Sequence, residues 1–125
     1  MKFLYRNLLR VMPYVFVFGL MLTTYLLLIE VLPSKSAWTY KDKMQHAMGF
    51  FLLALSARTG FPQKARIFYI GLVFYGALME VLQSLLTLTR EGSVYDWVAD
   101  VIGILLCVAI AKLMQSTLCQ EIVKT

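Results

Sequence analysis

Residues 67–88 read IFYIGLVFYGALMEVLQSLLTL, a run in which Glu80 is the only charged side chain. A helix that crosses a bilayer needs about 17–25 predominantly apolar residues to cover about 30 Å of hydrocarbon. This run meets that requirement, and no proline interrupts it. It therefore predicts a membrane-spanning helix that keeps one carboxylate within an apolar segment.

Three further apolar runs lie at 11–32, 44–57 and 97–114. The run at 44–57 is short, so it must borrow polar flanking residues, thin the bilayer or pack inside the bundle. The run at 11–32 also resembles a signal peptide, but its apolar core exceeds the usual 7–15 residues or so, which favours a retained anchor. We expect one all-α integral membrane domain over residues 1–125, a bundle of four transmembrane helices.

The composition excludes other classes of protein. The chain is 60% hydrophobic and only 15% charged, with a mean hydropathy of +0.73, whereas soluble domains carry about 45–50% apolar and about 25% charged residues. The net charge of +5 does not indicate nucleic-acid binding, because the basic residues form short clusters between the apolar runs. That distribution is typical of membrane orientation signals.

The basic clusters predict that both termini face the cytoplasm, since short cytoplasmic loops are enriched in Lys and Arg. With the amino terminus inside, the cytoplasmic side receives twice as many basic residues as the outer side. The cytoplasmic set is Lys2, Arg6, Arg10, Arg58, Lys64, Arg66, Lys112 and Lys124, and the outer set is Lys35, Lys41, Lys43 and Arg90. We therefore expect a multi-pass protein of a bacterial cytoplasmic membrane.

Polar and ionisable residues occur in or beside the spans, where each charged group costs about 2.5–3.5 kcal/mol at mid-helix. In the expected topology, the ends of three helices bring them to one depth, in the outer leaflet. Residues four or three apart share a helix face. The set comprises Asp42, Lys43 and His46 on the second helix, Glu80 and Gln83 on the third, Arg90 and Ser93 in the following loop, and Asp96 and Asp100 on the fourth.

Each of these residues also has a structural interpretation. Asp42 and Asp96 open helices, where a carboxylate caps free amides and meets the positive end of the dipole. Glu80 and Gln83 can form interhelical hydrogen bonds. Arg90 can pair with a neighbouring acid. The shared depth of the whole set is the observation that these separate interpretations do not explain.

The spacing of these residues resembles the VanZ-like family of small bacterial membrane proteins over about residues 40–106. The matching positions are Asp-Lys-Met-Gln-His at 42–46 with Phe50, Gly76-x-x-x-Glu80-x-x-Gln83, Arg90-x-x-Ser93-x-x-Asp96 and Asp100-x-x-Gly103. The resemblance implies a four-span protein, and the family's namesake is linked to low-level resistance to the glycopeptide teicoplanin. The family pattern usually has Asn where this chain has Asp100, which adds a negative charge at that position.

The leading hypothesis is an extracytoplasmic polar site that binds, and can modify, an anionic envelope lipid or lipid-linked cell-wall glycan. Lys43 and Arg90 would hold its phosphate or carboxylate, and Asp42, Gln83, Ser93 and Asp100 would complete the binding site. His46 would act as general acid or base, with Glu80 and Asp96 as its catalytic partners. The same groups could hold a divalent cation, although no spacing here is diagnostic of a metal site.

Two other functions are compatible with the sequence. A non-enzymatic scaffold for an envelope enzyme would tolerate conservative replacements such as His46→Gln. A proton-linked transporter would also use intramembrane acids and a histidine, but it needs polar residues across the whole membrane. The inner halves of these spans offer almost none, so the transporter ranks last.

Overall fold

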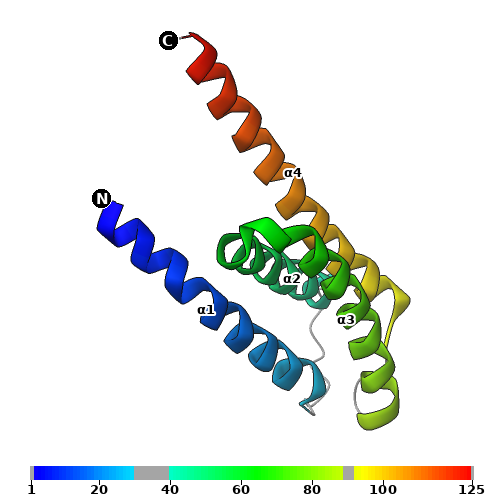
Figure 1. The fold of residues 1–125 in the computed structure, drawn as a ribbon. Coiled ribbons are helices and arrows are strands. Elements are labelled where there is room, and N and C mark those ends of the chain that lie inside the picture. Colours follow the sequence, from blue (N-terminus) through cyan, green and yellow to red (C-terminus); the bar gives the residue numbers. More distant parts are fainter. Residues whose placement is uncertain (1, 30–39, 89–91, 125) are drawn as a thin grey trace.

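The computed structural model describes residues 2–29, 40–88 and 92–124. Within these ranges the chain is all-helical, as expected, and strands are absent. Figure 1 shows the helices, which are α1 (Lys2–Leu28), α2 (Lys41–Gly60), the 3-10 turn η1 (Pro62–Lys64), α3 (Ala65–Leu86) and α4 (Val94–Lys124).

Three segments of the described chain are long and apolar enough to cross a membrane: Leu9–Leu28, Pro62–Leu86 and Val94–Ser116. They correspond to the first, third and fourth predicted spans and indicate a multi-pass membrane protein. At 20 residues, α2 is about 30 Å long at 1.5 Å per residue. However, α2 is not apolar enough to count among these segments, because it carries several charged residues, among them Lys41, Asp42 and Lys43. The fourth span and the orientation of the termini stay predictions.

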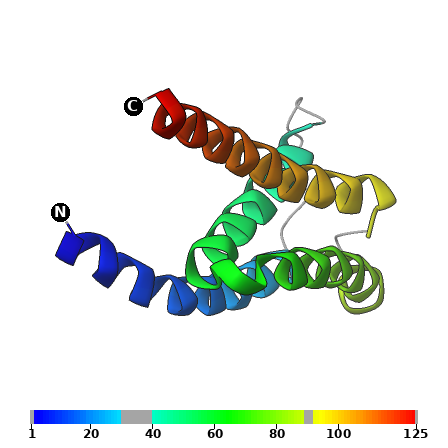
Figure 2. The same cartoon turned by 45° about the horizontal axis from the view of Figure 1, so that its top comes forward.

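Helix α2 occupies the centre of the molecule. It packs against α1, α3 and α4, whereas α1 and α4 make no contact with each other in the part of the chain that the structure describes. Figures 1 and 2 show α1 and α4 diverging toward the two termini, with α2 between them. A helix enclosed on several sides can carry polar groups that lipid would not accept, because neighbouring helices provide their partners.

The apolar core joins all four helices. Phe16 of α1, Phe50 and Leu53 of α2, and Leu72 of α3 are buried in it, together with Ala54, Ala57, Ile104 and Cys107. The outer surfaces of the bundle expose large apolar side chains, such as Phe18, Phe74 and Leu105. Exposed apolar area of this extent is unusual for a soluble monomer and is what lipid would cover.

The closest helix–helix approach lies between α2 and α4. A Cβ atom added at Gly103 would collide with the backbone carbonyl of Ala47 and would lie 3.0 Å from the backbone nitrogen of Phe51. Only glycine leaves room for two backbones at this separation. The contact therefore fixes the position of the α4 segment that contains Asp100 relative to the α2 segment that contains His46.

Candidate functional site

His46 is the centre of the polar cluster. It lies in the second turn of α2, is 4% exposed, and its Nδ1 lies 2.9 Å from Oδ1 of Asp100 on α4. Asp100 is completely buried. An ionised carboxylate can only accept, so the ring donates its Nδ1–H to Asp100 and keeps a lone pair on Nε2 in the neutral form.

Glu80 contributes a second buried carboxylate from α3, with 7% of its surface exposed. Its Oε2 accepts a 2.7 Å hydrogen bond from the backbone N–H of Ser93, just before α4. Its Oε1 lies 3.7 Å from Nδ1 of His46, too far for a hydrogen bond. Within the described residues, Oε1 of Glu80 and Oδ2 of Asp100 have no hydrogen-bond partner.

Lys43 and Asp96 form an ion pair beside this group. The Lys43 Nζ donates to Oδ1 of Asp96 at 2.8 Å, and the lysine side chain is 35% exposed whereas that of Asp96 is 8% exposed. The hydrogen bond to Asp96 raises the pKa of the Lys43 ammonium above its usual value, and partial desolvation opposes this increase. The lysine expected to hold a ligand's phosphate is thus paired with a carboxylate of its own chain.

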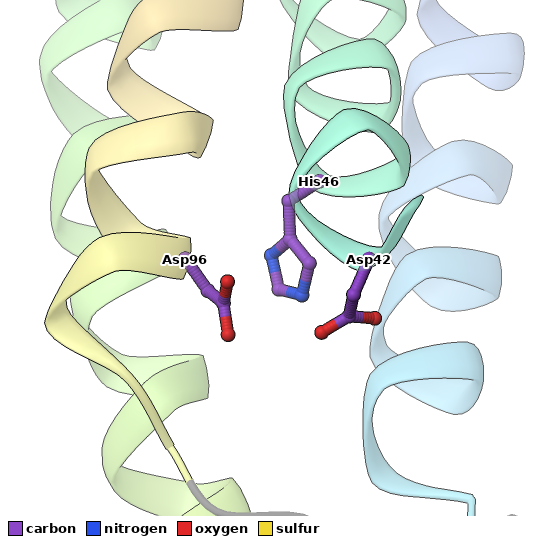
Figure 3. Close-up of side chains that lie close together, drawn as sticks. All are labelled: Asp42, His46 and Asp96. Atoms are coloured by element: carbon purple, nitrogen blue, oxygen red, sulfur yellow. The ribbon is translucent and has the colours of Figure 1, made fainter. Parts of the chain in front are cut away.

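Asp42 lies on the other side of the histidine. Figure 3 shows the imidazole of His46 between the carboxylates of Asp42 and Asp96, which point toward it from α2 and α4. One ligand atom from each of these three residues lies within 4.8 Å of the others. The same relation holds for His46, Glu80 and Asp100, so the one imidazole belongs to two groups that could hold a cation.

Gly76 allows Asp100 to reach this position. A Cβ at Gly76 would lie 2.9 Å from Oδ2 of Asp100 and 3.3 Å from Cδ1 of Trp97. Trp97 is held in place by a 3.0 Å hydrogen bond from its Nε1 to the carbonyl oxygen of Val73. The small residue on α3 therefore lets the first turns of α4 approach.

The remaining predicted residues have different positions. Gln83 is buried, but its Nε2 donates a 2.7 Å hydrogen bond to the carbonyl oxygen of Leu27 on α1. Gln83 therefore connects α1 with α3. Ser93 contacts Glu80 through its backbone, while its hydroxyl accepts from the N–H of Tyr95 at 3.2 Å. Arg90 lies outside the described residues. The ligand-binding roles of these three stay predictions.

An open hollow of about 280 Å³ adjoins the cluster where α3 faces the start of α4. Glu80 forms part of its wall, and its other lining residues are Ala77, Val81, Ser84, Gly92, Ser93, Val94 and Trp97. A largely apolar concavity with a few polar groups is the usual form of a small-molecule site. Of the three residues His46, Glu80 and Asp100, the hollow is lined by Glu80.

The sequence interpretation missed Gly92 and Trp97 as site residues. A Cβ at Gly92 would collide with the backbone carbonyl of Glu80, so this glycine permits the chain before α4 to pack against α3. The position of Gly92 beside Ser93 was a usable signal, whereas nothing in the sequence distinguishes Trp97 from an interfacial tryptophan.

Comparison with known proteins adds no assignment: no protein-family model, no curated protein and no solved structure matches the chain. The resemblance to the VanZ-like family stays a prediction that depends on the residues quoted above.

Proposed function

We propose that this chain is a VanZ-like, four-span protein of a bacterial cytoplasmic membrane, with both termini in the cytoplasm. Its polar cluster binds the head group of an anionic envelope lipid or lipid-linked cell-wall precursor in the outer leaflet, and thereby alters susceptibility to teicoplanin. One observation carries this proposal. Three helices bring His46, Glu80 and Asp100 together, and two of the buried carboxylate oxygens have no hydrogen-bond partner among the described residues.

Buried polar groups without partners are rare in native proteins, and a catalytic role or a bound ion is a common reason for one. In a membrane, intramembrane ionisable residues usually mark a functional site. The His46–Asp100 pair also has the form in which a carboxylate orients an imidazole for proton transfer. If the bound head group is modified, His46 is the group we expect to move the proton.

Resistance to teicoplanin tests this proposal in a susceptible bacterial host. We expect the wild-type chain to increase resistance and His46→Gln to abolish the increase at equal membrane abundance. Glu121→Gln on α4 is the control for a polar-to-amide replacement outside the cluster, because residue 121 lies about 30 Å along the helix axis from Asp100, at 1.5 Å per residue.

The outcomes separate the proposal from its alternatives. A wild-type chain that leaves resistance unchanged contradicts the proposal. Full activity of His46→Gln favours a scaffold, because a scaffold needs the shape of the bundle and not the imidazole. Mass spectrometry of the purified protein with an added lipid-linked precursor then tells whether the head group is bound and whether its mass changes.

A further inference from the structure

The charge of the cluster poses a problem for an anionic ligand. Glu80, Asp96 and Asp100 lie around His46, and the ammonium of Lys43 is paired with Asp96. Glu80 and Asp100 therefore have no lysine or arginine partner among the described residues. A bound cation would stabilise this arrangement and attract a phosphate.

We propose that His46, Glu80 and Asp100 bind a divalent metal ion of the manganese or zinc class. An unpartnered oxygen supports this site independently of the acidic residues themselves. Oε1 of Glu80, on a residue 7% exposed, lies 3.7 Å from Nδ1 of His46 and has no hydrogen-bond partner among the described residues. A buried carboxylate oxygen that accepts no hydrogen bond is unfavourable unless a cation or proton compensates it.

The distances suit such an ion. Metal–nitrogen and metal–oxygen bonds of about 2.0–2.2 Å place the ligand atoms of a tetrahedral site about 3.4 Å apart. The Nδ1 of His46 lies 2.9 Å from Oδ1 of Asp100 and 3.7 Å from Oε1 of Glu80. These two separations lie on either side of that value, and the three ligand atoms all lie within 4.8 Å of one another, so a small rearrangement of the side chains would bring all three to one ion.

The donor set narrows the choice of ion. Imidazole with carboxylates suits zinc and manganese, whereas calcium and magnesium prefer oxygen alone. Binding at Nδ1 displaces its proton and leaves the N–H on Nε2, the side of the ring that Figure 3 shows nearest to Asp42. A carboxylate in that place is the usual second contact of a metal-bound histidine.

A bound ion would connect the metal site with the proposed function. Two carboxylates balance a divalent ion, and three protein ligands leave at least one coordination position free. The hollow beside Glu80 gives access from the side of the bundle, so a phosphate could complete the coordination. The metal site itself does not depend on the lipid, because its ligands all belong to this chain.

Equilibrium dialysis against Mn²⁺, followed by elemental analysis, tests the inference on the full chain in detergent with no envelope lipid added. We expect saturable binding of one ion per chain, retained in Glu121→Gln. Glu80→Gln and Asp100→Asn should each weaken it by about 100-fold or more, because even outer-shell partners contribute about 10–100-fold. No saturable binding by the wild-type chain, or equal binding by these two variants, would overturn the site.

A spectroscopic measurement keeps the test decisive if the variants do not fold. His46 is the chain's one histidine, so the nitrogen coupling seen by pulsed electron paramagnetic resonance of bound Mn²⁺ reports on this residue alone. We expect one imidazole nitrogen bound to the ion. Binding without nitrogen coupling would place the ion elsewhere and refute the assignment. Metal binding without an effect on teicoplanin resistance would refute the proposed function and leave the metal site intact.

Discussion

Replacement of Gly103 by alanine would act directly on the contact that aligns α2 with α4. The added methyl group meets the backbone carbonyl of Ala47 and the backbone nitrogen of Phe51. Backbone atoms inside a helix cannot turn aside as a flexible side chain can. The two helices must therefore separate, which also draws Asp100 away from His46, because each lies within one turn of the contact.

The magnitude follows from two opposing effects. Overpacking a tight contact costs about 1–3 kcal/mol, and the upper part of that range applies because the obstructing atoms belong to the backbone. Alanine regains about 1 kcal/mol through its higher helix propensity. We expect a net loss of roughly 1–2 kcal/mol in the free energy of unfolding.

Reversible unfolding in mixed micelles with dodecyl sulfate, followed by circular dichroism, measures this loss. Gly49→Ala on α2 and Gly71→Ala on α3 are matched controls, since a Cβ at either position meets no atom within 4 Å. Both should be neutral or gain up to about 1 kcal/mol. If Gly103→Ala is as stable as these controls, the reasoning about the α2–α4 contact is wrong.

Three further predictions concern the hydrogen bond between α3 and α1, the Lys43–Asp96 pair and the orientation of the chain in the membrane. Gln83→Leu removes the hydrogen bond to α1 and should lower the free energy of unfolding by about 1 kcal/mol in the same unfolding assay; an unchanged value would show that this bond does not hold α1. Asp96 raises the pKa of Lys43 in the folded protein. The Lys43–Asp96 pair should therefore contribute its full stabilisation at pH values below 10.5, the ordinary pKa of lysine. This stabilisation should be lost as the pH rises through the higher pKa of the folded state. The difference in stability between wild type and Asp96→Asn, less than about 1 kcal/mol for a partly exposed pair, should therefore shrink as the pH rises above 10.5, and a difference that does not change there contradicts the Lys43–Asp96 pairing. Impermeant thiol reagents should label Ser93→Cys but not Gln63→Cys in intact cells, and labelling of the latter would reverse the proposed orientation.

The helices were predictable because long apolar runs have few other stable forms in lipid. Their ends were less predictable. Helix α4 continues to Lys124 although its apolar run ends near residue 114, since hydropathy sets where a helix leaves the membrane and not where it stops. Helix α2 extends beyond its apolar run at 44–57 as far as Gly60 and ends before Phe61. Phe61 has a ψ of 60°, outside the helical region. It precedes Pro62, and the proline ring disfavours the helical conformation of the residue before it.

The membership of the site was predictable in part, but its pairing was not. The expected topology placed His46, Glu80 and Asp100 at one depth. Which carboxylate meets the imidazole depends on how each helix is rotated about its axis, and close contacts at Gly76 and Gly103 set that rotation. For the same reason, Gln83 shares a face with Glu80 in a sequence projection and yet contacts α1.

Solid-state NMR of the chain in lipid bilayers would test the convergence of these helices most directly. With ¹⁵N in His46, the chain's one histidine, and ¹³C in the aspartate carboxyl groups, dipolar dephasing reports how close the imidazole lies to a carboxylate. The structure, with Nδ1 at 2.9 Å from Oδ1 of Asp100, predicts strong dephasing of Nδ1 that in Asp100→Ser falls to the weaker level contributed by Asp42 and Asp96. An imidazole with no nearby carboxyl carbon, or dephasing unchanged in that variant, would contradict a polar site formed between α2 and α4.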